Sequence, residues 1–557
     1  MKKDRLVPML FSVIKGYSRE QFFKDLIAGV IVAIIALPLS IALALASGVG
    51  PEEGIYTAIV AGFLISLFGG SKVQIAGPTA AFATIVAGIV ARNGMEGLML
   101  ATIFAGILLI LMGILRMGSL IHYIPYTITT GFTAGIAVTI LIGQLKDFFG
   151  IIIPKGTPTI ETMDKLMAVV RNFGTMNAQA LLVGVICVAV LIVWPYVPKI
   201  GAIVPGSLIA VFVGIGMVSG LGMHANTIGD LYTISNKLPS LHAVNFSWDA
   251  MRNAASNGFT IAVLAAIESL LSCVVADSMI NSQHRSNMEL IAQGIGNIGS
   301  ALFGGIPATG AIARTAANIK NGGRTPIAGM VHAVVLILVL IVLMPYAALI
   351  PMPTIAAILF LVAYNMCGWR TFVHLCKTAP KSDIIVLVTT FALTVCFDLV
   401  IAIGVGMVLS CLLLMKRMAE ETCVTGWKEF ESEEDPDNIE HKNVPDHVSV
   451  YEISGPMFFG AAERIAEISL MDTTKVLIIR MRAVPAVDAT ALHSLENLYN
   501  ECKAKNVQMI FSHINKQPFH SMEKAGFVDR IGRDNFCRHI DDALKRAAIL
   551  TQNEKKN

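Results

Sequence analysis

Apolar segments long enough to cross a bilayer recur along the first three quarters of the chain, and no other feature constrains the fold as much. A spanning helix needs about 20 apolar residues. We find about fourteen segments, several too short to span alone, and therefore expect an α-helical polytopic membrane protein in contact with lipid. The segments are 25–47, 54–68, 75–91, 97–116, 121–143, 179–197, 203–222, 256–276, 288–303, 308–320, 325–344, 353–366, 382–398 and 399–418.

The distribution of charge divides the chain into parts. Only 15% of residues are charged, whereas soluble proteins have about a quarter. The pattern predicts a cytoplasmic N-terminal segment at 1–24, a transmembrane transport domain at 25–418, an acidic linker at 419–446 and a soluble domain at 447–550. The net charge of +3 is too small to indicate nucleic acid as a partner.

Positive loop residues indicate the orientation in the membrane. They favour the side that carries the N-terminus, as cytoplasmic loops do. We therefore expect a multi-pass protein of the cell inner (plasma) membrane with both termini cytoplasmic and the loop 223–255 outside. The inside loops carry Lys72, Arg116, Lys199, Arg285, Lys320, Arg324, Arg370, Lys377, Lys381, Lys416 and Arg417, and the outside loops carry Arg92, Lys146, Lys155, Lys165, Arg171, Lys237 and Arg252.

Enzymatic and metal-binding signals are lacking. The nine cysteines include no Cys-x-x-Cys pair, so the sequence supports neither a disulfide framework nor a zinc site. There is no nucleophile, metal or nucleotide motif. We expect no catalytic residue, no metal and no cofactor.

A short internal repeat suggests the architecture. The motif Leu-Phe-Gly-Gly at 67–70 recurs at 302–305, and each copy is followed by a segment of small residues, at 77–81 and 308–311. If seven spans separate the copies, the second lies upside down in the membrane, which is the inverted-repeat plan of secondary transporters.

The short segments 75–91 and 308–320 resemble half-helices that begin near the bilayer midplane. Pro78 suits a first helical position, since its missing N–H would be unpaired there anyway. Two facing helix N-termini would direct free N–H groups and positive dipole ends at one point, which makes an anion site from backbone. Small residues let a ligand approach the backbone, but they equally allow tight helix packing. The sequence leaves both readings open.

The candidate substrate-binding residues belong to these two half-helices. Arg314 adds positive charge to the site, or else forms a structural ion pair with a carboxylate such as Glu268. The candidates are Thr79, Ala80, Gly310, Ala311, Ile312 and Arg314.

Ionisable residues inside membrane segments are costly and often functional. Glu268 lies in the middle of a span, where burial disfavours its charged form and suits it to proton coupling. His332 is expected to be a hydrogen-bonded packing residue, and Asp398 a loop or cap residue.

These residues resemble the sulfate permease family of anion transporters over nearly the whole chain. Leu39 follows Pro38 where many members have Gln. The motifs that carry the resemblance are Asp25-Leu26-Ile27-Ala28-Gly29, Ser47-Gly48-Val49-Gly50-Pro51, Gly54-Ile55-Tyr56, Gly77-Pro78-Thr79-Ala80, Ala266-Ile267-Glu268-Ser269-Leu270-Leu271 and Arg314-Thr315-Ala316-Ala317-Asn318.

The resemblance implies a seven-plus-seven inverted repeat divided into core and gate domains. It implies an anion held between the third and tenth helices, an elevator-type motion and a homodimer. It is most similar to the bacterial branch that carries four-carbon dicarboxylates such as succinate or fumarate, with sulfate as the other candidate substrate.

The resemblance also places the coupling carboxylate at Glu268, with Ser272 one turn away. Some members hold sodium at this pair with Asp and Thr, and the departure here favours protons. We therefore expect a proton-coupled secondary transporter. The alternatives are a sodium-coupled bicarbonate transporter, an uncoupled anion channel and a membrane-anchored sensor.

The C-terminal domain alternates predicted strands with predicted helices. The strands are 447–453, 475–481 and 507–512, and the helices are 461–470, 488–503, 517–525 and 539–549. This alternation predicts an α/β domain, and it resembles the STAS domain. Ala489 stands where anti-sigma-factor antagonists have a phosphorylated Ser, with Thr490 beside it. The domain is therefore expected to bind a protein partner rather than to be regulated at Ala489.

Overall fold

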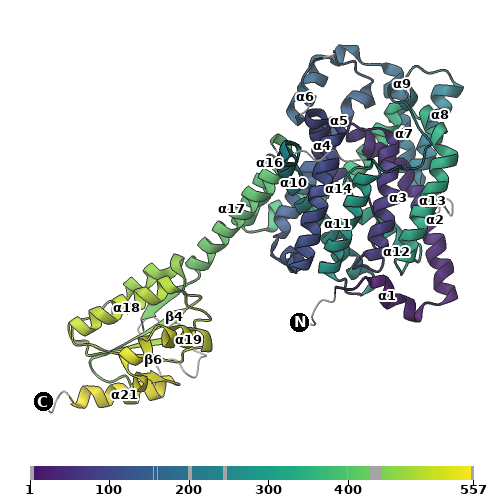
Figure 1. Cartoon of the computed structure of the whole chain (residues 1–557). Helices are drawn as coiled ribbons and strands as arrows, with labels where there is room; N and C mark the ends of the chain where they lie inside the picture. Colours follow the sequence, from purple (N-terminus) through teal and green to yellow (C-terminus); the bar gives the residue numbers. More distant parts are fainter. Residues whose placement is uncertain are drawn as a thin grey trace. The chain divides into compact units, whose positions relative to one another are not determined.

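The computed structural model describes residues 6–154, 156–159, 161–198, 204–242, 248–397, 399–426 and 442–553. The chain forms two compact units, Met1–Met407 and Val408–Asn557 (Figure 1). Asp398 and the acidic residues expected in a linker, Glu429 to Asp437, lie outside the described residues.

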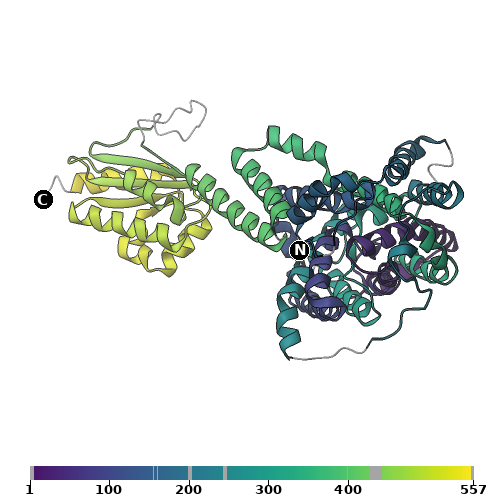
Figure 2. The same ribbon diagram turned by 90° about the horizontal axis from the view of Figure 1, so that it is seen from above.

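The first unit is a bundle of helices, most of which run side by side (Figures 1 and 2). Its helices are α1 (Met9–Val13), α2 (Arg19–Ala46), α3 (Pro51–Phe68), α4 (Ala80–Ile114), α5 (Tyr126–Phe149), α6 (Thr162–Arg171), α7 (Ala178–Val193), α8 (Gly206–Ile215), α9 (Ile228–Leu231), α10 (Trp248–Ile280), α11 (Ser286–Leu302), α12 (Ile312–Lys320), α13 (Ile327–Leu343), α14 (Met352–Cys367), α15 (Trp369–Thr378), α16 (Lys381–Cys396) and α17 (Leu399–Glu420). The last of these runs across the boundary between the units.

The apolar segments predicted from the sequence are all present as helices. In the described part of the chain, 9 helices are long and apolar enough to cross a membrane. The longest, α4, contains two predicted segments, because Gly94 has a left-handed φ of 69° and interrupts the helix between them. The shorter α8, α11, α12 and α16 account for the rest, so the predicted fold class is confirmed.

Four short helices of the first unit were not predicted from the sequence. They are α1, α6, α9 and α15. Each has 10 residues or fewer. A search for spans of about 20 apolar residues cannot detect them.

Two short strands pair within the first unit, and we call this pair the strand crossing. β1 (Ala76–Gly77) and β2 (Thr309–Gly310) pair antiparallel, with Ala76 opposite Gly310 and Gly77 opposite Thr309. The two strands lead directly into α4 and α12, which therefore leave the crossing in opposite directions, as an inverted repeat requires.

The prediction that Pro78 opens a helix was wrong. The helix begins at Ala80 with Thr79 as its N-cap, so Pro78 lies outside it. Pro78 instead ends β1, because a residue without an N–H cannot continue a strand ladder. Its carbonyl oxygen accepts a 3.4 Å hydrogen bond from Arg314 Nη2.

The second unit contains a five-stranded sheet in the order β3-β4-β5-β6-β7. The strands are β3 (Cys423–Gly426), β4 (Val448–Ser454), β5 (Val476–Ala483), β6 (Gln508–Ser512) and β7 (Phe536–Cys537), and the helices are η9 (Phe459–Glu467), α18 (Ala489–Ala504), α19 (Lys516–Lys524), α20 (Phe527–Ile531) and α21 (Ile540–Asn553). Only β3 is antiparallel to its neighbour.

Helices cover both faces of this sheet (Figure 2). One core contains α18 and α20, and the other contains α21. The predicted α/β architecture is therefore confirmed. The sequence did not predict β3, which lies in the range expected to be a linker, or the two-residue β7.

Candidate functional site

The strand crossing brings the predicted half-helix residues together. Thr79 is the N-cap of α4 and Ala80 its first residue, while Ala311 is the N-cap of α12 and Ile312 its first residue. The backbone N–H of Ala311 donates to the carbonyl oxygen of Ile75 at 2.9 Å, which fixes the second helix start against the first strand.

Neither N-cap side chain takes up the free N–H groups of its helix. Thr79 has a hydroxyl, but it is directed elsewhere, and Ala311 has no polar side chain. First-turn N–H groups without an intrahelical acceptor need another partner. Together with the helix dipole, they form a natural site for a negative group.

Arg314 adds a buried cation one turn into α12. Its side chain is almost completely buried, at 1% exposed. Nη2 donates to Ser40 Oγ at 3.1 Å, and the guanidinium lies against Gly77, where an added Cβ would be 2.3 Å from Nη1. Nε and Nη1 have no hydrogen-bond partner among the described residues.

The ion pair that the sequence left open, between Arg314 and Glu268, is not formed in the described structure. Glu268, on α10, accepts a hydrogen bond from Thr79 Oγ1 at 3.0 Å instead. The positive charge of Arg314 therefore remains uncompensated beside the helix starts, which is the arrangement an anion site needs.

The remaining predicted residues occupy less direct positions. Ser272 lies one turn from Glu268 on α10, is completely buried, and its hydroxyl has no partner among the described residues. Ile312 is 47% exposed. His332 is buried beside Gly62, as expected of a packing residue, but neither ring nitrogen has a hydrogen-bond partner among the described residues.

A cavity of about 340 Å³, with both apolar and polar lining residues, lies between α4, α5, α6, α10, α16 and α17. None of the predicted site residues lines it. However, Thr84, which lines the cavity, lies one turn beyond Ala80 on α4. Thr260, which also lines it, lies two turns before Glu268 on α10. One face of each of these helices therefore leads from the cavity to the strand crossing. Its polar and charged lining residues are Thr84, Arg92, Asn93, Thr139, Glu161, Thr162, Asn257, Thr260 and Thr394.

The sequence reasoning missed several polar residues of this region. Glu289 lies within the predicted apolar segment 288–303 and is completely buried, and Gln74 precedes the first half-helix. A carboxylate inside an apolar segment is itself a signal, so Glu289 was detectable from the sequence.

The second unit contains no comparable site in its described residues. Asp488 caps α18 by accepting from the Ala491 N–H at 2.8 Å, and it also accepts from the Phe459 N–H at 2.9 Å. Ala489 and Thr490 are exposed at the start of this helix. Among the described residues of the whole chain, no group of three or more His, Cys, Asp or Glu side chains is arranged to hold a metal.

Sequence comparison places this architecture among known proteins. The profile of the sulfate permease family matches residues 22–390, and that of the STAS domain matches residues 439–543. YvdB of Bacillus subtilis, named for sulfate transport, is 40% identical over 536 residues, covering 95% of this chain and 98% of that protein. The bicarbonate transporter BicA of Picosynechococcus is 32% identical and covers 94% of both chains.

The fold also matches a solved structure over both units. Murine Solute Carrier 26 family member A9, an anion transporter solved in the inward-facing state, superposes with a TM-score of 0.87 at 20% identity, covering 98% of this chain and 94% of that chain. Neither bacterial relative has a name that mentions a four-carbon dicarboxylate, so the narrower assignment to that branch is not supported.

Proposed function

The chain belongs to the sulfate permease family, and on this premise we propose that it transports small inorganic anions, with sulfate and bicarbonate as the leading substrates. These two substrates are those in the names of the relatives YvdB and BicA. Succinate and fumarate are candidates only because the sequence resembles the bacterial branch that carries four-carbon dicarboxylates.

One observation carries the proposal. Two uncapped helix N-termini begin at the β1–β2 crossing, and the buried guanidinium of Arg314 lies beside them without an acidic partner among the described residues. A small anion supplies the missing partner for both the N–H groups and the cation. We propose that the anion contacts the backbone at Thr79, Ala80, Gly310 and Ala311.

We further propose that transport is coupled to protons through Glu268. The Thr79 hydroxyl links this carboxyl group directly to the N-cap of α4, so a change in its protonation state acts on the anion site. In this mechanism an elevator-type movement carries the strand crossing, together with α4, α10, α12 and the helices packed against them, past the remaining helices. The cavity lined by Arg92 is the outer access route. The sodium-coupled bicarbonate transporter is the second candidate, because BicA is a relative.

The test is uptake into proteoliposomes that contain the purified full-length protein. Labelled sulfate, bicarbonate and succinate are supplied separately, with an inward proton gradient, an inward sodium gradient or neither. Concentrative uptake of sulfate or bicarbonate under the proton gradient supports the proposal. Accumulation driven only by sodium supports the alternative, and uptake of none of the anions contradicts both.

A further inference from the structure

A second buried carboxylate, Glu289 on α11, lies behind the strand crossing and has no role in the mechanism above. One carboxylate oxygen, Oε2, accepts hydrogen bonds from the backbone N–H groups of Gly70 and Ser71 at 2.9 and 3.2 Å. The other oxygen accepts from the side chains of Gln74 at 3.0 Å and Gln293 at 2.9 Å, and from Ser269 Oγ at 3.3 Å. Five donors therefore converge on one group.

In the described part of the chain, no lysine or arginine forms an ion pair with Glu289. A carboxylate can be buried without a cation when hydrogen bonds replace its hydration. Burying a carboxylate without a cation costs free energy, and each of its five donors would be left unsatisfied if it were absent. The Glu289 carboxylate therefore holds these donor groups in a defined arrangement.

Glu289 holds the amide of Gln74, which has hydrogen-bond partners at both its nitrogen and its oxygen. Its nitrogen also donates to Ser269 Oγ at 3.2 Å, and its oxygen accepts from the thiol of Cys273. Both partners on this side belong to α10, and Ser269 is the residue after Glu268. The amide therefore connects the loop before β1 to the helix that carries Glu268.

Gln74 in turn packs against Gly310, on β2. A Cβ atom placed on Gly310 would be 2.0 Å from the amide nitrogen of Gln74 and 2.5 Å from its carbonyl carbon. Only glycine allows this contact, and Gly310 is the residue that pairs with Ala76 across the crossing. The Gln74 amide thus packs directly against the second strand.

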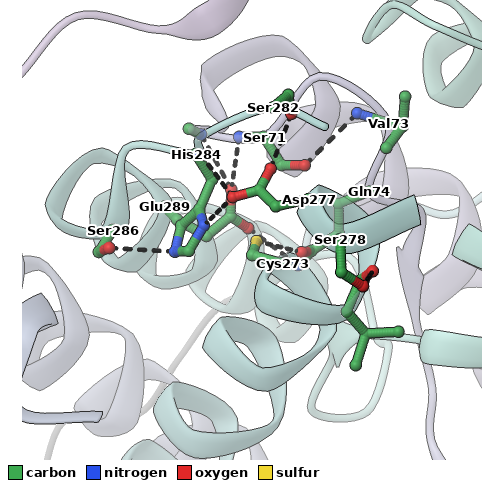
Figure 3. A network of polar contacts seen from close by, with 12 residues as sticks. Ser71, Val73, Gln74, Cys273, Asp277, Ser278, Ser282, His284, Ser286 and Glu289 are labelled. Atoms are coloured by element: carbon green, nitrogen blue, oxygen red, sulfur yellow. Dashed lines mark hydrogen bonds and ion pairs between the residues drawn. The ribbon is translucent and has the colours of Figure 1, made fainter. Parts of the chain in front are cut away.

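Hydrogen bonds around the turn between α10 and α11 hold the start of α11, the helix that carries Glu289, in place. Asp277 accepts from His284 Nδ1 at 2.7 Å, from the His284 N–H at 2.7 Å and from Ser282 Oγ at 2.8 Å (Figure 3). Ser286 contacts the other ring nitrogen of His284 at 3.0 Å. This closed turn precedes Glu289 by a single helical turn.

We propose that Glu289 and Gln74 are positioning residues for the anion site. Glu289 orients the Gln74 amide, and the amide sets the distance between the two helix N-termini by its contact with Gly310. Neither side chain contacts the anion in this mechanism. The inference rests on the proposed function, because it assigns the anion to the strand crossing.

The test measures KM and kcat for sulfate and bicarbonate uptake by full-length variants in proteoliposomes. In Glu289→Gln, an NH2 group replaces one carboxylate oxygen and faces N–H and O–H groups that had donated to that oxygen, so Gln74 loses its orientation. We expect the KM to rise about tenfold or more, with a smaller change in kcat, since a donor left unsatisfied costs about a tenfold factor or more in an equilibrium constant.

Exchanging the carboxylate and the amide between positions 289 and 74 distinguishes a positioning role from a general loss of stability. In the double variant Glu289→Gln/Gln74→Glu, the network again contains one carboxylate and one amide, so most of the increase in KM should be reversed. Thr102→Val is the matched control. Thr102 is equally buried in α4, but its hydroxyl bonds only to its own helix, at Leu98 O.

The outcomes separate this inference from the proposed function. A monodisperse Glu289→Gln protein with wild-type KM overturns the positioning role, and so does a rise in KM that the double variant fails to reverse. If Glu289→Gln does not fold, Ser269→Ala is the deciding variant, because it removes one hydroxyl from the network. The KM of Ser269→Ala should rise about threefold. An unchanged KM in this variant overturns the positioning role. A wild type that transports neither anion contradicts the proposed function as well.

Discussion

The hydroxyl of Thr79 donates a 3.0 Å hydrogen bond to the carboxylate of Glu268. Thr79 is the N-cap of α4, where a threonine side chain usually accepts from its own helix. Here the side chain faces α10 instead, so the helix keeps its free N–H groups and the carboxyl gains a direct contact with the N-cap residue of the proposed anion site.

This contact makes Glu268→Gln a clean test of proton coupling. The amide oxygen of Gln can still accept from Thr79, so the local geometry is preserved while the proton-carrying group is lost. We expect the variant to exchange anion across proteoliposome membranes but not to concentrate it against an inward proton gradient. Full proton-driven accumulation by this variant would exclude Glu268 as the coupling residue.

Much of this site was predictable from the sequence, because its parts are local. Small residues at two repeated motifs predicted half-helices within 75–91 and 308–320, and the helices begin at Ala80 and Ile312. Their convergence depends on the pairing of Ala76 with Gly310. Two-residue strands have no periodic pattern of their own, so the sequence did not predict this pairing.

The partners of the charged residues were not predictable in the same way. The sequence left Arg314 between an anion site and an ion pair with Glu268. The structure gives Arg314 the hydroxyl of Ser40, 274 positions away, and gives Glu268 the hydroxyl of Thr79, 189 positions away. Contacts this remote depend on how α2, α10 and α12 pack, which hydrophobicity patterns do not encode.

Gly310→Ala is predicted to weaken anion transport strongly. The added methyl group would be 2.0 Å from the amide nitrogen of Gln74, so either the amide or β2 must move. Gly143→Ala is the matched control, since Gly143 lies in α5 with no atom within 4 Å of the added Cβ. We expect sulfate or bicarbonate uptake to fall about tenfold or more in the first variant and to be unchanged in the second. Equal uptake by both would show that the close approach at Gly310 is not required.

Arg314→Ala should reduce anion affinity, because it removes an uncompensated buried charge beside the helix starts. We expect KM for uptake to rise about tenfold or more. Arg314→Lys keeps the charge without the planar guanidinium, and it should retain part of the affinity. The measurement is initial uptake rate against anion concentration. Wild-type KM in both variants would place the anion site elsewhere.

The predicted orientation can be tested by labelling introduced cysteines in intact cells. Asn236 lies in a loop expected outside and Asn321 in a loop expected inside. The experiment uses a background in which the exposed Cys396, Cys411 and Cys423 are replaced by serine. A membrane-impermeant maleimide should modify Asn236→Cys but not Asn321→Cys before the cells are broken. The opposite pattern would reverse the assignment of both termini to the cytoplasm.

Arg92 is predicted to recruit the anion from outside. Among the residues that the structure describes, Arg92 is the only lysine or arginine that lines the cavity, and Glu161 is the only acidic residue there. An exposed cation that lines a cavity raises the local anion concentration without contacting the final site. Arg92→Gln should therefore raise KM for external sulfate or bicarbonate by about threefold to tenfold and leave kcat nearly unchanged. The difference between variant and wild type should shrink at high salt, where exposed charges are screened.

The matched control for this prediction is Arg171→Gln, at the end of α6. Arg171 is exposed and predicted to lie on the same side of the membrane, but it does not line the cavity. If recruitment depends on the cavity, only Arg92→Gln changes KM. If general surface charge is responsible, the two variants should show equal shifts. An unchanged KM in Arg92→Gln, measured for initial uptake into intact cells, would exclude this cavity as the outer route to the strand crossing.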